Sequence, residues 1–99
     1  MEIKIIDIFG KLAENKDLAK NVRMNLITPA LNNKEEVILN FKGVESTTQS
    51  FIHALISQVI KEKGEDILDK IYFKSCNKSI KKIIEIVVEY MQTGTNAIY

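Results

Sequence analysis

Apolar residues recur along the chain with a period of two in some stretches and of about 3.6 in others, as in strands and helices respectively. Residues 2–9 are rich in isoleucine and predict a first strand with at least one buried face, which Gly10 ends. Residues 36–41 are almost continuously apolar, as expected of a central strand that is covered on both faces. Residues 70–74 supply a third strand.

A helix is predicted between the first two strands. From about residue 15 to Thr28, apolar side chains recur near helical spacing. Thr28 precedes Pro29, and the residue before a proline avoids helical backbone angles. We therefore expect this helix to end near Thr28, and residues 31–35 to form a polar loop.

The second helix is predicted to follow the central strand and its turn. Ser46 and Gln49 have the spacing of a capping box, in which each side chain bonds the backbone near the other residue. The helix should run from Ser46 to Lys63, and Gly64 lies just past its end, where a left-handed residue is favoured.

The last helix is expected to be capped by Asn77 or Ser79 and to end at Gly94, before a frayed or loosely packed tail. Its apolar residues form one stripe, made of Ile80, Ile83, Ile84, Val87, Val88 and Met91. The order β-α-β-α-β-α favours an α/β fold with a small, mainly parallel sheet and helices packed on it. With 99 residues, the chain has the size of a single domain, residues 1–99.

Composition narrows the range of functions. Fourteen basic and thirteen acidic residues leave a net charge of +1, and the lysines are interleaved with acidic residues, so we expect no nucleic-acid binding. No apolar run approaches the roughly 20 residues that span a bilayer, and no signal peptide is recognisable. We therefore expect a soluble, cytoplasmic protein without membrane contact.

No credible set of catalytic or metal-binding residues is found. The chain has one histidine, His53, and one cysteine, Cys76, and it lacks the glycine motifs that bind phosphates. We therefore expect no enzymatic activity, no metal and no cofactor. A Cys76–His53 nucleophile pair remains the weaker alternative, because contact in space cannot be read from sequence.

Small polar residues gather where the second helix begins. Residues 46–50 carry four hydroxyl groups, more than one helix cap requires. In α/β domains this place lies at the carboxyl ends of the strands, where partners and ligands commonly bind. A helix N-terminus also favours negative charge, so the backbone there would accept a phosphate on one of these hydroxyls.

Residues 37–44 and then 45–55 resemble, in order, the core signature of STAS domains. In anti-sigma factor antagonists that signature is an apolar strand ending in Asp, a Ser-Gly-Val turn, and an Asp-Ser-Ser-Gly-Leu segment that opens a helix. Phe51 after the serine, and the strand at residues 71–74 before a long helix, look more like the STAS-like family of unknown function. Its members are short bacterial chains, often encoded beside histidine-kinase-type ATPases. The resemblance covers residues 36–91.

The resemblance implies a role for each matched position. Ser50 matches the serine that is phosphorylated in the antagonists, and is the phosphoacceptor candidate. Asn40 and Thr48 stand where those proteins have Asp, and Phe51 stands where they have Gly, so the surroundings of the serine differ from the phosphorylated pattern. The implied partner-binding residues are Ser46, Thr47, Thr48, Gln49, Ser50 and Phe51.

The leading hypothesis is a non-enzymatic regulatory module that binds a GHKL-type (histidine-kinase-like) ATPase or a similar protein through the start of the second helix. The alternative is a small-ligand or anion sensor of the STAS type without a phosphorylation switch, which would require small or polar residues at core positions. A homodimer formed through residues 90–99 or an uncovered edge strand is also compatible with the sequence.

Overall fold

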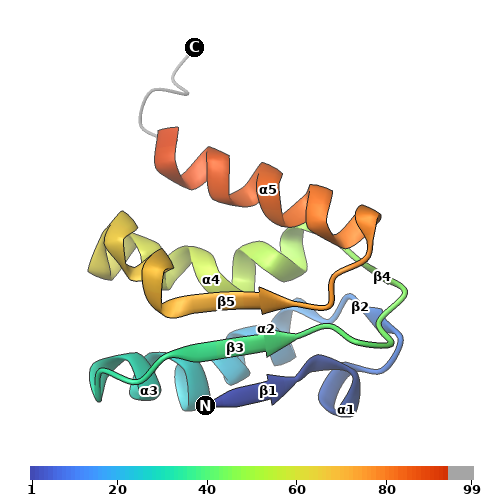
Figure 1. Ribbon diagram of the computed structural model, residues 1–99, viewed down its shortest axis with the longest axis horizontal. Helices are drawn as coiled ribbons and strands as arrows, with labels where there is room; N and C mark the ends of the chain where they lie inside the picture. The colour runs from blue at the N-terminus through green and yellow to red at the C-terminus, as the bar shows by residue number, and fades with distance from the viewer. Residues whose placement is uncertain (94–99) are drawn as a thin grey trace.

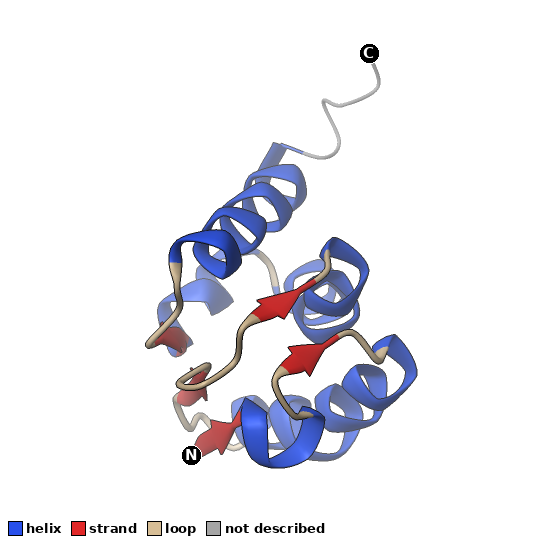
Figure 2. Cartoon of the chain, turned by 90° about the vertical axis from the view of Figure 1, so that its right-hand side faces the viewer, coloured by secondary structure: helices blue, strands red, loops and turns tan. Residues whose placement is uncertain are grey.

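The computed structural model describes residues 1–93 and contains short strands separated by helices. Helices, blue in Figure 2, account for most of the chain around a small group of strands. The elements in chain order are β1 (Glu2–Lys4), α1 (Ile5–Phe9), β2 (Leu12–Ala13), α2 (Lys16–Val22), η1 (Arg23–Ile27), α3 (Thr28–Asn32), β3 (Val37–Asn40), β4 (Ser46–Thr47), α4 (Gln49–Lys63), η2 (Glu65–Lys70), β5 (Ile71–Lys74) and α5 (Lys78–Thr93).

Strands β1, β3 and β5 form a parallel sheet with β3 in the centre. The register places Ile3 opposite Leu39, and Leu39 opposite Phe73. In Figure 1 the three strands point the same way, α4 and α2 lie behind them, and α5 lies beyond the β5 edge. The predicted α/β fold with a small parallel sheet is therefore confirmed. A second parallel pair, β2 with β4, was not predicted.

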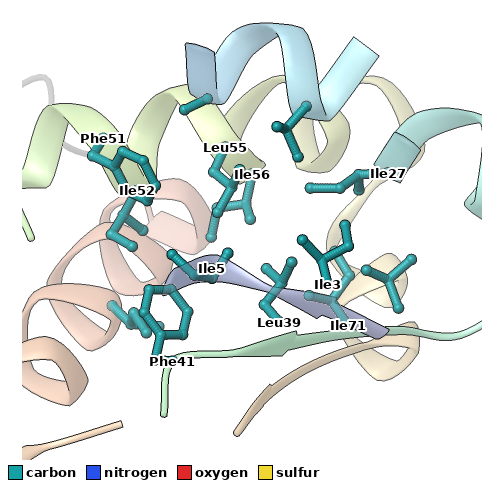
Figure 3. Close-up of a cluster of buried hydrophobic side chains, with 14 of the residues drawn as sticks. Ile3, Ile5, Ile27, Leu39, Phe41, Phe51, Ile52, Leu55, Ile56 and Ile71 are labelled. Atoms are coloured by element: carbon teal, nitrogen blue, oxygen red, sulfur yellow. The ribbon is translucent and has the colours of Figure 1, made fainter. Parts of the chain in front are cut away.

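The core lies between the sheet and the helices on one of its faces. Side chains from the strands, including Ile3 and Leu39, point toward Leu55 and Ile56 of α4 in Figure 3. The largest fully buried side chains are Phe41, Phe51, Ile5, Ile27, Leu39, Ile52, Leu55, Ile56, Ile80, Val37 and Val59.

The opposite face of the sheet carries polar and aromatic side chains. Glu2, Lys4, Tyr72 and Lys74 are exposed there, and Ile38 is only half-buried. The expectation that the central strand is covered on both faces is therefore wrong. Helices α2 and α4 cover one face of β3 (Figure 1), and Ile38 on the other face is half-buried.

The first strand is shorter than predicted, since it ends at Lys4 and residues 5–9 form α1. Lys4 pairs with Asn40, the last residue of β3, so the sheet offers no partner for a longer β1. The isoleucines of α1 instead pack against the core, with Ile5 fully buried. The helix ends at Gly10, whose N–H donates to the carbonyl of Ile6.

The first long helix continues past Pro29, so the prediction that it ends near Thr28 is wrong. Residues 23–27 form a wider π turn, in which the N–H of Thr28 donates to the carbonyl of Arg23. A widened turn accommodates a proline, because the ring would otherwise clash with the carbonyl four residues earlier. Residues 31 and 32, predicted as loop, belong to α3, and Leu31 is buried.

The C-terminal end of α4 and the start of α5 agree with the sequence. The N–H of Gly64 donates to the carbonyl of Ile60 at the end of α4. Asn77 caps α5, because its Oδ1 accepts from the N–H of Ile80 at 2.9 Å. The predicted end at Gly94 and the tail lie outside the described residues. No helix within residues 1–93 is long and apolar enough to cross a membrane.

Candidate interaction surface at the start of α4

The turn between β3 and α4 is held by two hydrogen bonds from backbone N–H groups, and it contains a glycine that lies close to a side chain of α1. Oδ1 of Asn40 accepts from the N–H of Lys42 at 2.9 Å, and the N–H of Val44 donates to the carbonyl of Phe41 at 2.9 Å. Gly43 has a φ of +84°, and a Cβ there would lie 2.8 Å from Cδ1 of Ile6. A glycine is therefore required at this turn, which directs the chain toward α4.

Asn40 has a structural role at the position where the antagonists carry Asp. Its side chain is buried and its Nδ2 donates to Oε2 of Glu2 at 2.6 Å. The same carboxylate oxygen lies 4.0 Å from Nζ of Lys74. Asn40 thus links the ends of β1 and β3, and an amide is needed to donate to Glu2 and accept from the backbone.

Thr48, and not Ser46, caps α4. Thr48 has extended backbone angles, and its Oγ1 accepts from the N–H of Phe51 at 3.1 Å. Ser46 lies in β4, whose pairing with β2 removes it from the helix. The predicted capping box is therefore wrong, because the pairing of β2 with β4 depends on residues more than thirty positions apart, which a local motif does not include.

Two of the six predicted contact residues belong to the interior. Phe51 is 0% exposed, and its ring packs edge-on against Phe9 with centroids 4.7 Å apart. Thr47 is buried, and its hydroxyl donates to the carbonyl of Ala13 at 2.7 Å. In this conformation neither side chain is available to a docked partner, so their inclusion in the contact surface is corrected. Both instead fix the start of α4 to α1 and β2.

Gln49 and Ser50 are the exposed residues of the first turn of α4. The hydroxyl oxygen of Ser50 lies 3.3 Å from Oγ1 of Thr48, the capping atom. Ser46 and Thr48 are partly exposed beside them. The structure therefore gathers Ser46, Thr48, Gln49 and Ser50 at one accessible helix end.

A hollow of about 580 Å³ adjoins Ser50 and is named the α4/α5 hollow below. It is lined by Lys16 of α2, by Gln49, Ser50, His53 and Ala54 of α4, and by Ile86, Val87 and Tyr90 of α5. The contribution of α5 was missed from the sequence. Ile86 and Tyr90 lie one turn apart and off the core stripe of α5, which is the signal that could have found them.

A second hollow, of about 730 Å³, lies between α2, η1 and α4 and is named the α2/α4 hollow. It is lined by Lys20, Arg23, Met24, Thr28, His53, Ala54, Ser57, Gln58 and Glu62. Nη1 of Arg23 donates to the carbonyl of Ala54 at 3.2 Å, so this guanidinium is held against α4. His53 and Ala54 line both hollows, which are therefore adjacent along α4.

The structure does not bring His53 and Cys76 together. Nδ1 of His53 lies 3.2 Å from Oγ of Ser57, within α4. Cys76 lines a different hollow with Phe73 and Lys81, and burial raises the pKa of its thiol. A raised thiol pKa disfavours the nucleophilic thiolate, so the Cys76–His53 alternative gains no support. Within residues 1–93, no group of three or more potential ligands is arranged to hold a metal ion.

Comparison with known protein families gives one match. A family model described as a STAS-like domain of unknown function matches residues 18–81, from α2 into the first turn of α5. This segment includes β3, the turn at Gly43 and the whole of α4. No curated protein and no solved structure matches the chain.

Proposed function

Because the chain belongs to the family of STAS-like domains of unknown function, we propose that it is a non-enzymatic regulatory module that binds a protein partner through the start of α4. The exposed residues of that helix end, Gln49 and Ser50, form the contact, together with the partly exposed Ser46 and Thr48. The observation that carries this proposal is the position of Ser50, exposed in the first turn of a capped helix and on the wall of the α4/α5 hollow.

Ser50 is proposed as the regulatory residue of this contact. A phosphate on its hydroxyl would lie at the N-terminus of α4, where free N–H groups and the helix dipole favour negative charge. It would add about −1.5 to −2 charges to a helix end whose own side chains, Ser46, Thr48, Gln49 and Ser50, are neutral. Such a change alters the affinity of a partner without disturbing Phe51 and Thr47, which hold the helix end from inside.

The proposed partner is a GHKL-type ATPase or a similar kinase-like protein, by analogy with the antagonists that the sequence resembles. Such a partner would both bind the helix end and supply the phosphate. The alternative, a small-ligand or anion sensor, requires space in the core. Side chains such as Leu39, Phe41 and Leu55 fill the region between sheet and helices, which favours the interaction module.

The proposal is tested by purifying the protein with a GHKL-type ATPase of the same organism and measuring complex formation with and without ATP. We expect a complex, and mass spectrometry should show one added phosphate on Ser50. The affinity should be at least about tenfold lower for Ser50→Glu, because the added negative charge faces partner groups that are complementary to a neutral serine.

Ser79→Glu is the matched control. Ser79 is exposed and occupies the second position of α5, as Ser50 does in α4, and it follows the cap Asn77 as Ser50 follows Thr48. The control variant should bind like the wild type. Absence of a complex, or equal losses in the two variants, contradicts the proposed function.

A further inference from the structure

The hollow beside Ser50 has an apolar wall on α5 and a lysine, Lys16, on α2, and further cations line the adjacent hollow. The apolar wall is the part of α5 that carries Ile86 and Tyr90, which are 38% and 55% exposed, respectively. Val87 and Ala54 form the bottom of the α4/α5 hollow between that wall and α4. Exposed apolar side chains around a concave site are typical of places where a partner inserts an anchoring side chain.

The basic wall is a row of cations on one face of α2 and the first residue of η1. Lys16, Lys20 and Arg23 follow at four- and three-residue steps, which places them above one another on a helix. Lys16 lines the α4/α5 hollow, and Lys20 and Arg23 line the α2/α4 hollow. Within the described range, neither Lys16 nor Lys20 takes part in an ion pair, whereas Lys11 and Lys74 do.

The charge of this surface is uneven along α4. Among residues 1–93, no Asp or Glu lines the α4/α5 hollow, and the one acidic residue that lines the α2/α4 hollow, Glu62, lies in the last turn of α4. The N-terminus of α4 adds the positive end of its dipole beside Lys16. Positive potential is thus concentrated at the end of the surface that contains Ser50.

We propose that this surface, which comprises the α4/α5 and α2/α4 hollows, binds an acidic amphipathic helix of the protein partner. An apolar side chain of that helix enters the α4/α5 hollow against Ile86 and Tyr90, and its carboxylates face Lys16, Lys20 and Arg23. The inference rests on the proposed function, since it names the chemistry of the partner that contacts the start of α4.

Charge complementarity and shape favour this occupant over others. The two hollows share His53 and Ala54 and are therefore adjacent, so an elongated element can contact both, which a small molecule in one hollow does not. Complementary charge speeds encounter and sets orientation, while buried apolar anchors slow dissociation. A helix with acidic residues on one edge and apolar residues at i, i+3 or i+4, and i+7 presents both features at once.

The test uses displayed random peptides of about 20 residues, long enough to form a helix across the surface, selected on the purified protein. We expect the enriched peptides to carry Asp or Glu beside apolar residues at helical spacing. Their affinity should fall at least about tenfold for Tyr90→Ala and for the double variant Lys16→Glu with Lys20→Glu, and should weaken as salt concentration rises.

The matched control is Lys78→Glu with Lys82→Glu, which makes the same charge change at the same spacing on exposed residues of α5 outside both hollows. It should leave peptide affinity unchanged. Enrichment of neutral or basic peptides, or equal losses in the two double variants, overturns the inference. So does a wild-type homodimer that Tyr90→Ala dissociates, because the surface then binds a second copy of this chain.

The two proposals fail separately. If the ATPase binds and Ser50→Glu weakens it, but Lys16→Glu with Lys20→Glu does not, the proposed function stands and the acidic helix is excluded. If acidic peptides bind as described but the ATPase does not, the surface is confirmed and the named partner is wrong.

Discussion

Tyr72 illustrates how a single side chain on the open face of the sheet depends on a residue that directly precedes the neighbouring strand β3. Its hydroxyl donates to Oε2 of Glu36 at 2.9 Å. This hydrogen bond and the negative charge of the carboxylate raise the pKa of Tyr72 above the usual value of 10.0. The folded protein therefore holds the phenolic proton more tightly than the unfolded chain does.

The sign of the pH dependence follows from that raised pKa. The contribution of Tyr72 to stability is fully present below a pH of about 10, the pKa of a free tyrosine, and is lost as the pH rises through the folded pKa. In an alkaline titration of tyrosinate absorbance, the signal removed by Tyr72→Phe should therefore appear above that pH.

Glu36→Gln should move this signal to lower pH, because it removes the negative charge and weakens the hydrogen bond. Glu35→Gln, which neutralises the adjacent exposed carboxylate, is the control and should leave the titration in place. A Tyr72 signal that does not change with Glu36→Gln would assign the shift to a different cause.

At the scale of elements, α4 depends on one capping residue that sequence motifs misplace. Thr48 supplies the hydroxyl that accepts from the N–H of Phe51, while Ser46 pairs as part of β4. The side chain of Ser46 makes no hydrogen bond to another residue of the described range. The start of α4 is thus held by the cap hydrogen bond of Thr48 and by the buried side chain of Phe51.

Thr48→Ala should lower the free energy of unfolding by about 1 kcal/mol, the usual value of a lost N-cap. Ser46→Ala should change it by less than about 0.5 kcal/mol, as a surface substitution does. Chemical denaturation of the two variants decides between them. A larger loss of unfolding free energy for Ser46→Ala would show that Ser46 caps the helix, as the sequence suggests.

The whole molecule is a sheet with helices on one face, and this arrangement predicts which strand residues carry stability. Leu39 and Ile38 are neighbours in β3 with similar volumes, but Leu39 faces α4 and is fully buried, while Ile38 lies on the open face. Without the structure, the apolar run of β3 gives no reason to distinguish them.

Leu39→Ala should therefore destabilise the protein by about 2 to 5 kcal/mol, because it leaves a cavity in the core. Ile38→Ala should cost about 1 kcal/mol or less, because the neighbouring side chains and water can fill the space. Urea denaturation measures both. Equal losses would mean that a further layer, such as a second molecule, covers the open face.

The sequence by itself determined the alternation of strands and helices, the mainly parallel sheet and the apolar stripe of α5, and it limited the cap of α5 to Asn77 or Ser79. These features follow from local periodicity and from short-range backbone chemistry, which consecutive residues contain completely. The choice of residues 46–50 as part of the candidate contact surface also came from their local composition, and Ser50 and Gln49 are exposed in the structure.

Only the tertiary structure decided where β1 ends, which face of the sheet is covered, and which of residues 46–51 are accessible. Each depends on contacts between distant segments: β1 with β3, β2 with β4, and Phe9 with Phe51. The same holds for the surface beside Ser50, where α2 supplies lysines and α5 supplies Ile86 and Tyr90. A periodic pattern shows that a helix has an apolar face, but not which other helices will lie beside it.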